Sequence, residues 1–129
     1  MGNVTSKRIL VVGHCGMDGP RLVRILSEQF RGASVERINS PDDLDAALKN
    51  EDALLLVNRE PVGFDSTGLQ IVRDVCKSHP EATVMLISDH ADAQEEARQA
   101  GAVPGIGKSK MDSPEFTRAV SAALGRDAR

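Results

Sequence analysis

The chain has 129 residues, of which 40% are hydrophobic and 27% charged, and its formal net charge is −3. This length fits a single domain whose core is large enough to fold without a disulfide or a structural metal. The acidic balance, the dispersed lysines and arginines and the absence of tryptophan and tyrosine argue against a nucleic-acid binder, and the sequence shows no apolar run of the length that a membrane span or a signal peptide needs.

Five apolar runs rich in β-branched residues predict strands, and they occupy residues 8–12, 33–38, 53–57, 82–87 and 103–106. Runs such as ALLLV and TVMLI are nearly continuous apolar stretches, which are typical of strands buried on both faces of a parallel sheet. The run at 103–106 is the shortest of the five.

A helix pattern follows each of these strands, and most of the patterns begin with a capping residue or a proline. The caps that we expect are Asp18 or Gly19, Ser40, Asp65 or Ser66, and Ser113. Gly101 and Gly125 predict where the fourth and fifth helices end. Five strand–helix pairs without a linker predict one α/β domain, a doubly wound sandwich of three layers.

Doubly wound folds bind their ligands at the carboxyl ends of the strands. The turn GHCGMDGPR follows the first predicted strand and therefore lies where this architecture places its chemistry. Cys15 and Cys76 have no metal-ligand spacing between them, which favours a reducing compartment, so we expect a cytoplasmic protein.

Several stretches share a pattern with one known family: KRILVVG as the first strand, DALLLVNREP followed by Gly68 as the third strand and its loop, TVMLIS as the fourth strand, and ARQAGAVPGIGK leading through the fifth. On these stretches, the chain resembles the receiver domains of bacterial response regulators over roughly residues 7–124. The resemblance implies a CheY-like, flavodoxin-like parallel sheet of five strands in the order 2-1-3-4-5. It also implies one receiver-like domain over residues 1–129, with its core at about 7–125 and no output domain.

In that family, an aspartate at the end of the third strand accepts a phosphoryl group, and two acids after the first strand help to bind Mg²⁺. The two acids align with Gly13 and His14, and neither residue offers the oxygen ligand that Mg²⁺ requires. The acceptor aligns with Val57 when counted back from Pro61, or with Asn58 if one gap is allowed. The resemblance therefore implies a degenerate receiver without a phosphoacceptor, metal or cofactor.

Two other family positions are retained. Ser88 falls on the hydroxyl position after the fourth strand, and Lys108 matches the lysine that ends the fifth strand. Taken singly, Ser88 could be a helix cap and Lys108 a surface lysine. Together, at the family spacing, they are interpreted as the remains of a pocket, able to hold a small anion or to bond to Asn58.

The opening turn also permits a different chemistry. Cys15 and Arg21 form a Cys-x5-Arg pair between a strand and a helix, as in protein tyrosine phosphatases and arsenate-reductase-like enzymes. Asp18 would repel phosphate there, Leu22 replaces the usual hydroxyl, and no Asp-Pro pair supplies a general acid. The simpler interpretation is that Cys15 is a half-buried loop residue and that Arg21 is solvated.

His14 is open to several interpretations. It could close the strand end, bond to Asp18 or Asp89, or replace an acid as a pH-sensitive group. A zinc site built from His14, Cys15, Asp18 and Asp89 is conceivable but is not favoured, because nothing in the sequence sets its geometry.

The leading functional hypothesis is a stand-alone signalling module of the two-component, phosphorelay type. It would not be phosphorylated by the usual route and would not be an enzyme. We expect it to bind a protein of a bacterial signalling pathway, and to form a homodimer through its fourth helix, fifth strand and fifth helix, without binding nucleic acid or a membrane. The alternative is a Cys-dependent phosphatase that uses Cys15 and Arg21.

Overall fold

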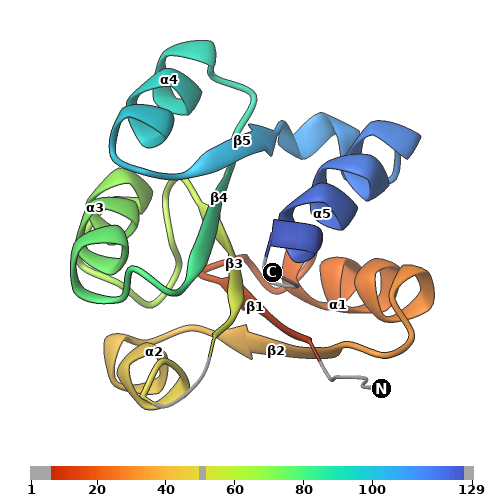
Figure 1. Cartoon of the computed structure of the whole chain (residues 1–129), viewed down its shortest axis with the longest axis horizontal. Coiled ribbons are helices and arrows are strands. Elements are labelled where there is room, and N and C mark those ends of the chain that lie inside the picture. Colours follow the sequence, from red (N-terminus) through yellow and green to blue (C-terminus); the bar gives the residue numbers. More distant parts are fainter. Residues whose placement is uncertain (1–6, 50–51, 127–129) are drawn as a thin grey trace.

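The computed structural model describes residues 7–49 and 52–126 of the chain. Strands and helices alternate along it, as Figure 1 shows. The elements are β1 (Arg8–Val12), α1 (Asp18–Gln29), β2 (Ser34–Ile38), α2 (Pro41–Ala47), β3 (Leu54–Asn58), α3 (Gly68–Ser78), β4 (Thr83–Ile87), α4 (Ala91–Gln99), β5 (Val103–Ile106), the 3₁₀ turn η1 (Lys108–Lys110) and α5 (Pro114–Arg126). Each predicted strand is present, and its ends agree with the prediction to within one residue.

The five strands form one parallel sheet in the order β2-β1-β3-β4-β5, which confirms the expected fold class. Central β3 pairs with β1 on one side and with β4 on the other. The register shifts between β4 and β5 near Met85 and Ile87, so this pairing is irregular. Because all five strands run in the same direction, their carboxyl ends lie at one edge of the sheet, and each of the helices α1–α4 connects this edge back to the start of the next strand.

Two apolar cores lie on opposite faces of this sheet. Successive side chains of a strand point to opposite faces, so Leu55 and Val57 join the cluster beneath α2, α3 and α4, while Leu54 and Leu56 join the cluster beneath α1 and α5. Phe116 of α5 is the largest fully buried side chain. The three layers are visible in Figure 1. None of the helices in the described ranges is long and apolar enough to cross a membrane.

Two of the predicted helix caps are confirmed. Ser40 Oγ accepts a hydrogen bond from the backbone N–H of Asp43 at 3.1 Å, ahead of α2. Ser113 Oγ accepts one from the N–H of Phe116 at 3.3 Å, ahead of α5. Both follow the rule that a short hydroxyl side chain satisfies a free N–H of the first turn.

Three predicted helix boundaries are wrong. The N-cap of α3 is Thr67, not Asp65 or Ser66, because its Oγ1 accepts from the N–H of Gln70 at 3.1 Å and the longer loop keeps the two earlier residues outside the helix. Likewise, α5 ends at Arg126, one residue after Gly125, so this glycine lies in the last turn of the helix and not beyond its end.

The third boundary is the start of α1, where Met17, and not Asp18 or Gly19, is the N-cap and makes no side-chain cap. The first N–H groups of the helix donate hydrogen bonds to Cys15 instead. The N–H of Gly19 donates to the Cys15 carbonyl at 2.8 Å, and the N–H of Asp18 to its Sγ at 3.3 Å. A hydroxyl or carboxylate cap is therefore not needed at this end.

Candidate functional site

A polar cavity of about 330 Å³ opens at the carboxyl edge of the sheet. Its walls come from the loops that follow β1, β3, β4 and β5. The lining residues are Cys15, Asn58, Arg59, Glu60, Val62, Ile87, Ser88, Asp89, His90 and Lys108. The structure thus brings together three residues that the sequence analysis assigned to one pocket, namely Asn58, Ser88 and Lys108.

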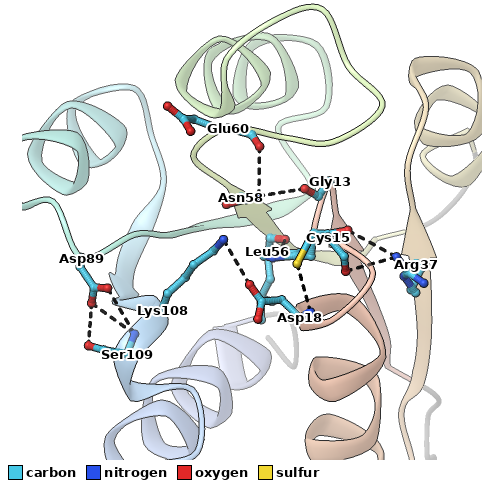
Figure 2. A network of polar contacts seen from close by, with 11 residues as sticks. Gly13, Cys15, Asp18, Arg37, Leu56, Asn58, Glu60, Asp89, Lys108 and Ser109 are labelled. Carbon is cyan, nitrogen blue, oxygen red and sulfur yellow. Dashed lines mark hydrogen bonds and ion pairs between the residues drawn. The ribbon is translucent and has the colours of Figure 1, made fainter.

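The end of β3 decides which of two neighbouring residues reaches the cavity. Val57 is completely buried in the apolar cluster beneath α2–α4. Asn58 is 5% exposed and lies in the cavity wall. Its Nδ2 donates to the carbonyl of Gly13 at 2.9 Å and to that of Glu60 at 3.1 Å, as Figure 2 shows. The amide thereby ties the β3–α3 loop to the end of β1.

The backbone at Gly13 requires glycine. Its φ is +75°, a conformation that side chains disfavour. A Cβ added there would collide with Pro61, and its carbonyl also accepts from the N–H of Val62 at 2.8 Å. The loop after β3 therefore occupies the space into which a side chain at residue 13 would extend, so a side-chain ligand at this position would collide with it.

Lys108 points across the cavity to the start of α1. Its Nζ lies 3.3 Å from Oδ2 of Asp18, with side chains 37% and 25% exposed, respectively. Figure 2 shows this pair spanning the gap between the β5–α5 and β1–α1 loops. From the sequence, Asp18 was considered as a helix cap, as a partner of His14, as a zinc ligand and as a repellent of phosphate, but not as a partner of Lys108, so this ion pair was not predicted.

Ser88 and Asp89 hold the loop after β4. Ser88 is buried, and its Oγ accepts from the N–H of His90 at 3.1 Å, while the N-cap of α4 is His90 itself. Asp89 accepts from the hydroxyl of Ser109 at 2.8 Å and from its N–H at 3.3 Å. The contacts between Asp89 and Ser109, also drawn in Figure 2, join the β4–α4 loop to η1.

His14 does not line the cavity but is completely buried beside it. Its Nε2 lies 2.9 Å from the carbonyl of Leu56, which can only accept, so this nitrogen carries the proton. Burial lowers the pKa of the imidazole from 6.5 to about 4, against the opposing effect of the Leu56 hydrogen bond. The ring is therefore neutral at pH 7, and it is bonded to Leu56 rather than to Asp18 or Asp89 through this nitrogen.

The structure gives little support to a metal site. Within residues 7–49 and 52–126, no three His, Cys, Asp or Glu side chains converge as a metal would require. Asp18, one of the four residues considered for zinc, is instead paired with Lys108.

Cys15 and Arg21 are not directed at the same space. Cys15 lines the cavity, and its thiol is free and half-buried. Arg21 instead forms a 2.7 Å ion pair with Asp112, in the loop before α5. A phosphate bound at the thiol would thus lack the guanidinium that a Cys-x5-Arg site uses. This geometry does not favour the phosphatase alternative.

The polar groups of the cavity are mostly satisfied by one another. Asn58 is bonded to two carbonyls, Lys108 to a carboxylate, and Ser88 to a backbone N–H. Arg59 lies 3.5 Å from the carboxylate of Glu60. Two basic and two acidic side chains line the cavity, Arg59 and Lys108 beside Glu60 and Asp89. Each of the two cations thus has a carboxylate within 3.5 Å.

Comparison with known proteins identifies the fold. No family model and no curated protein matches the sequence. Among solved structures, a CheY-like response regulator receiver domain from Methanospirillum hungatei JF-1 superposes with a TM-score of 0.78 at 21% identity, covering 96% of this chain and 98% of its own. The signal receiver domain of a DNA-binding response regulator from Colwellia psychrerythraea 34H gives 0.74 at 15% identity, covering 93% and 99%.

A third structure has its phosphoryl group in place. It is a response regulator from Burkholderia pseudomallei with a phosphorylated aspartic acid and a calcium ion, and it superposes with a TM-score of 0.70 at 21% identity, covering 92% of this chain and 66% of its own. These likenesses show that the chain has the receiver-domain fold.

Proposed function

We propose that this chain is a receiver-like signalling module of the two-component type that is not switched by phosphorylation and acts in the cytoplasm by binding a protein. The fold supports the class of module, since its structural neighbours are receiver domains. The state of the cavity supports the absence of phosphoryl transfer. The proposal depends on both observations, and the second is specific to this chain.

The proposal depends most on Asn58, whose side chain is an amide and not a carboxylate. It stands at the end of β3, where a receiver needs a carboxylate nucleophile, and both of its Nδ2 hydrogen bonds go to backbone carbonyls. An amide cannot form the acyl phosphate that an aspartate forms. Mg²⁺ would find no oxygen ligand from the side chains of Gly13 and His14. Lys108, which would otherwise contact the phosphoryl group, is paired with Asp18.

Phosphorylation is tested by treating the full chain with acetyl phosphate and Mg²⁺ and measuring its intact mass. We expect no covalent phosphoryl adduct, while a receiver domain with an intact acceptor, run in parallel, is labelled. A Mg²⁺-dependent adduct on this chain would overturn the proposal.

The same preparation tests the absence of turnover. We expect no hydrolysis of an aryl phosphate, because Arg21 is paired with Asp112 and does not line the cavity beside Cys15. Hydrolysis that disappears in Cys15→Ser would instead establish the Cys-dependent phosphatase.

A homodimer through α4, β5 and α5 is the form of self-association that we propose. The exposed face of α4 carries both signs of charge, with Glu95 and Arg98 already paired at 2.9 Å, which permits complementary pairing across an interface. Light scattering on the purified chain should give the mass of a dimer, and Arg98→Glu should shift it toward the monomer. Arg24→Glu on α1 is the matched control. A monomer at all concentrations would contradict this assignment.

A further inference from the structure

A second hollow lies away from the cavity, between α2 and α3. It has a volume of about 190 Å³ and lies against the core beneath α2–α4. Its floor is apolar, with Leu44 and Leu48 on the α2 side, Ile71 and Val75 on the α3 side, and Phe64 from the loop before α3. We call this hollow the α2–α3 groove.

The groove is bounded by two helices that run in the same direction, because each returns from the carboxyl edge of a parallel sheet. Figure 1 shows α2 and α3 side by side on one face. Pro41 and Ser66 lie at the end where the helices start, and Ser78 and His79 lie where they finish. An α2 of this length is about 10 Å long, which matches a short peptide segment.

Each wall of the groove carries one carboxylate. Asp45 stands on α2, and Asp74 stands on α3, where Gln70 Nε2 donates to it at 3.0 Å. Asp42 and Asp43 add two more exposed carboxylates to α2, which carries no lysine or arginine. Within the described part of the chain, no lysine or arginine lines the groove either. Among the lining residues, the charged side chains are thus the two aspartates, with His79 at one end, while Arg73 and Lys77 of α3 line a different hollow.

The size of the groove indicates what it accepts. Pockets for small-molecule ligands span about 300–1,000 Å³, so this groove is too small for one. It is large enough for an apolar side chain inserted from a peptide that lies across it. Peptides commonly dock in this way, with an apolar anchor in a hollow and charged residues at its rim.

We propose that the α2–α3 groove binds a short segment of a partner protein that places an aliphatic side chain between lysines or arginines. The aliphatic side chain packs against the floor, and the cations lie beside Asp45 and Asp74. This inference rests on the part of the proposed function in which the chain binds a protein, and it names the surface and the kind of segment; neither phosphorylation nor the α4–β5–α5 face takes part in it.

The test uses the full, isotope-labelled chain and the blocked peptide KRLLKR, with backbone amide chemical shifts as the readout. We expect the shifts to concentrate on α2 and α3. The peptide KRAAKR, which lacks the anchor, should bind at least tenfold more weakly, and the acidic peptide EDLLDE should not bind. Shifts centred on the cavity or on α4 and α5, equal binding of the three peptides, or no binding at millimolar concentration would each overturn the proposal.

Variants make the test specific to the groove. Asp45→Asn combined with Asp74→Asn should weaken KRLLKR by about fivefold to tenfold, the effect expected for two exposed charges. Asp92→Asn, an exposed aspartate on α4, is the matched control and should leave the affinity unchanged. Ser78→Phe should abolish binding by filling one end of the groove, and its amide spectrum shows whether the fold is kept. Equal affinity in all of these variants would contradict the assignment, while leaving the phosphorylation result unaffected.

Discussion

His14 is a buried imidazole whose charge the fold excludes. Its pKa falls from 6.5 to about 4 through burial, so the unfolded chain binds the proton more tightly than the folded chain does. The contribution of neutral His14 to the free energy of unfolding is therefore fully present above pH 6.5, and it is lost as the pH falls toward 4. This difference in pKa corresponds to about 3 kcal/mol of unfolding free energy.

Denaturant unfolding at a series of pH values should show this loss between pH 6.5 and 4. His14→Gln retains a group able to donate to the Leu56 carbonyl but cannot be protonated, so its curve should be flatter over the same window. Parallel curves for the two proteins would show that carboxylates, rather than His14, cause the acid sensitivity.

Gly13 provides a second prediction for a single residue. Gly13→Asp would place an acid in the turn after β1, but it would bring a Cβ against Pro61 at a φ of +75°. We expect a loss of about 2–4 kcal/mol in unfolding free energy, from backbone strain and the collision together. Gly16→Asp is the matched control, because a Cβ at Gly16 meets no atom within 4 Å. Equal stability of the two variants would show that the loop after β3 yields easily.

The sequence could predict some of these residues better than others. Asn58, Ser88 and Lys108 were singled out through the resemblance to receiver domains, because each falls on or next to a position that the family places at a strand end. The choice between Val57 and Asn58 needed the structure, because the two differ only in which face of the sheet they reach. The Lys108–Asp18 pair could not be predicted, since its members are far apart in the sequence and meet only when the loops fold over the sheet edge.

At the scale of elements, Gln94 attaches α4 to the end of β4. Its Nε2 donates to the carbonyls of Leu86 at 2.9 Å and Ser88 at 3.1 Å. The pairing of β4 with β5 is irregular there, between Met85 and Ile87. The side chain thus supplies hydrogen bonds at the place where the strand ladder is interrupted.

We expect Gln94→Ala to lower the unfolding free energy by about 1–3 kcal/mol, because two partly buried carbonyls lose a donor. Hydrogen exchange should also accelerate in α4 relative to α1. Gln99→Ala removes an exposed amide from the same helix and should cost less than about 0.5 kcal/mol. Similar losses in both variants would mean that helix propensity, and not the contact with β4, explains the effect.

The elements themselves were largely predictable. Long apolar runs locate the strands because both faces of a parallel sheet are buried, and Ser40 and Ser113 locate two helix starts through their hydroxyls. The errors concern helix ends. Asp65 and Ser66 precede Thr67 and are also suitable N-cap residues, so the sequence did not single out Thr67. Cys15 supplies the acceptors at the start of α1, and α5 extends one residue beyond Gly125. Each outcome depends on the path of a loop, which local propensity does not determine.

At the scale of the whole molecule, the candidate site is assembled from four loops, so one substitution is not expected to create a phosphorylation site. Asn58→Asp places a carboxylate at the end of β3, yet the side chains of Gly13 and His14 still offer no oxygen ligand for Mg²⁺. The new carboxylate would face the carbonyls of Gly13 and Glu60, which now accept from the Asn58 amide. We therefore expect no adduct with acetyl phosphate and Mg²⁺, and a loss of about 1–3 kcal/mol in unfolding free energy.

Asn58→Ala separates the two causes of this loss, because it removes the donor without adding a charge. Asn58→Asp should be the less stable of the two at pH 7, and the gap should narrow as the pH falls and the carboxylate takes up a proton. Intact mass and denaturant unfolding on the same samples provide both readouts. A Mg²⁺-dependent adduct on Asn58→Asp would mean that another carboxylate, such as Glu60 or Asp89 of the cavity wall or Asp18 released from Lys108, can hold the metal.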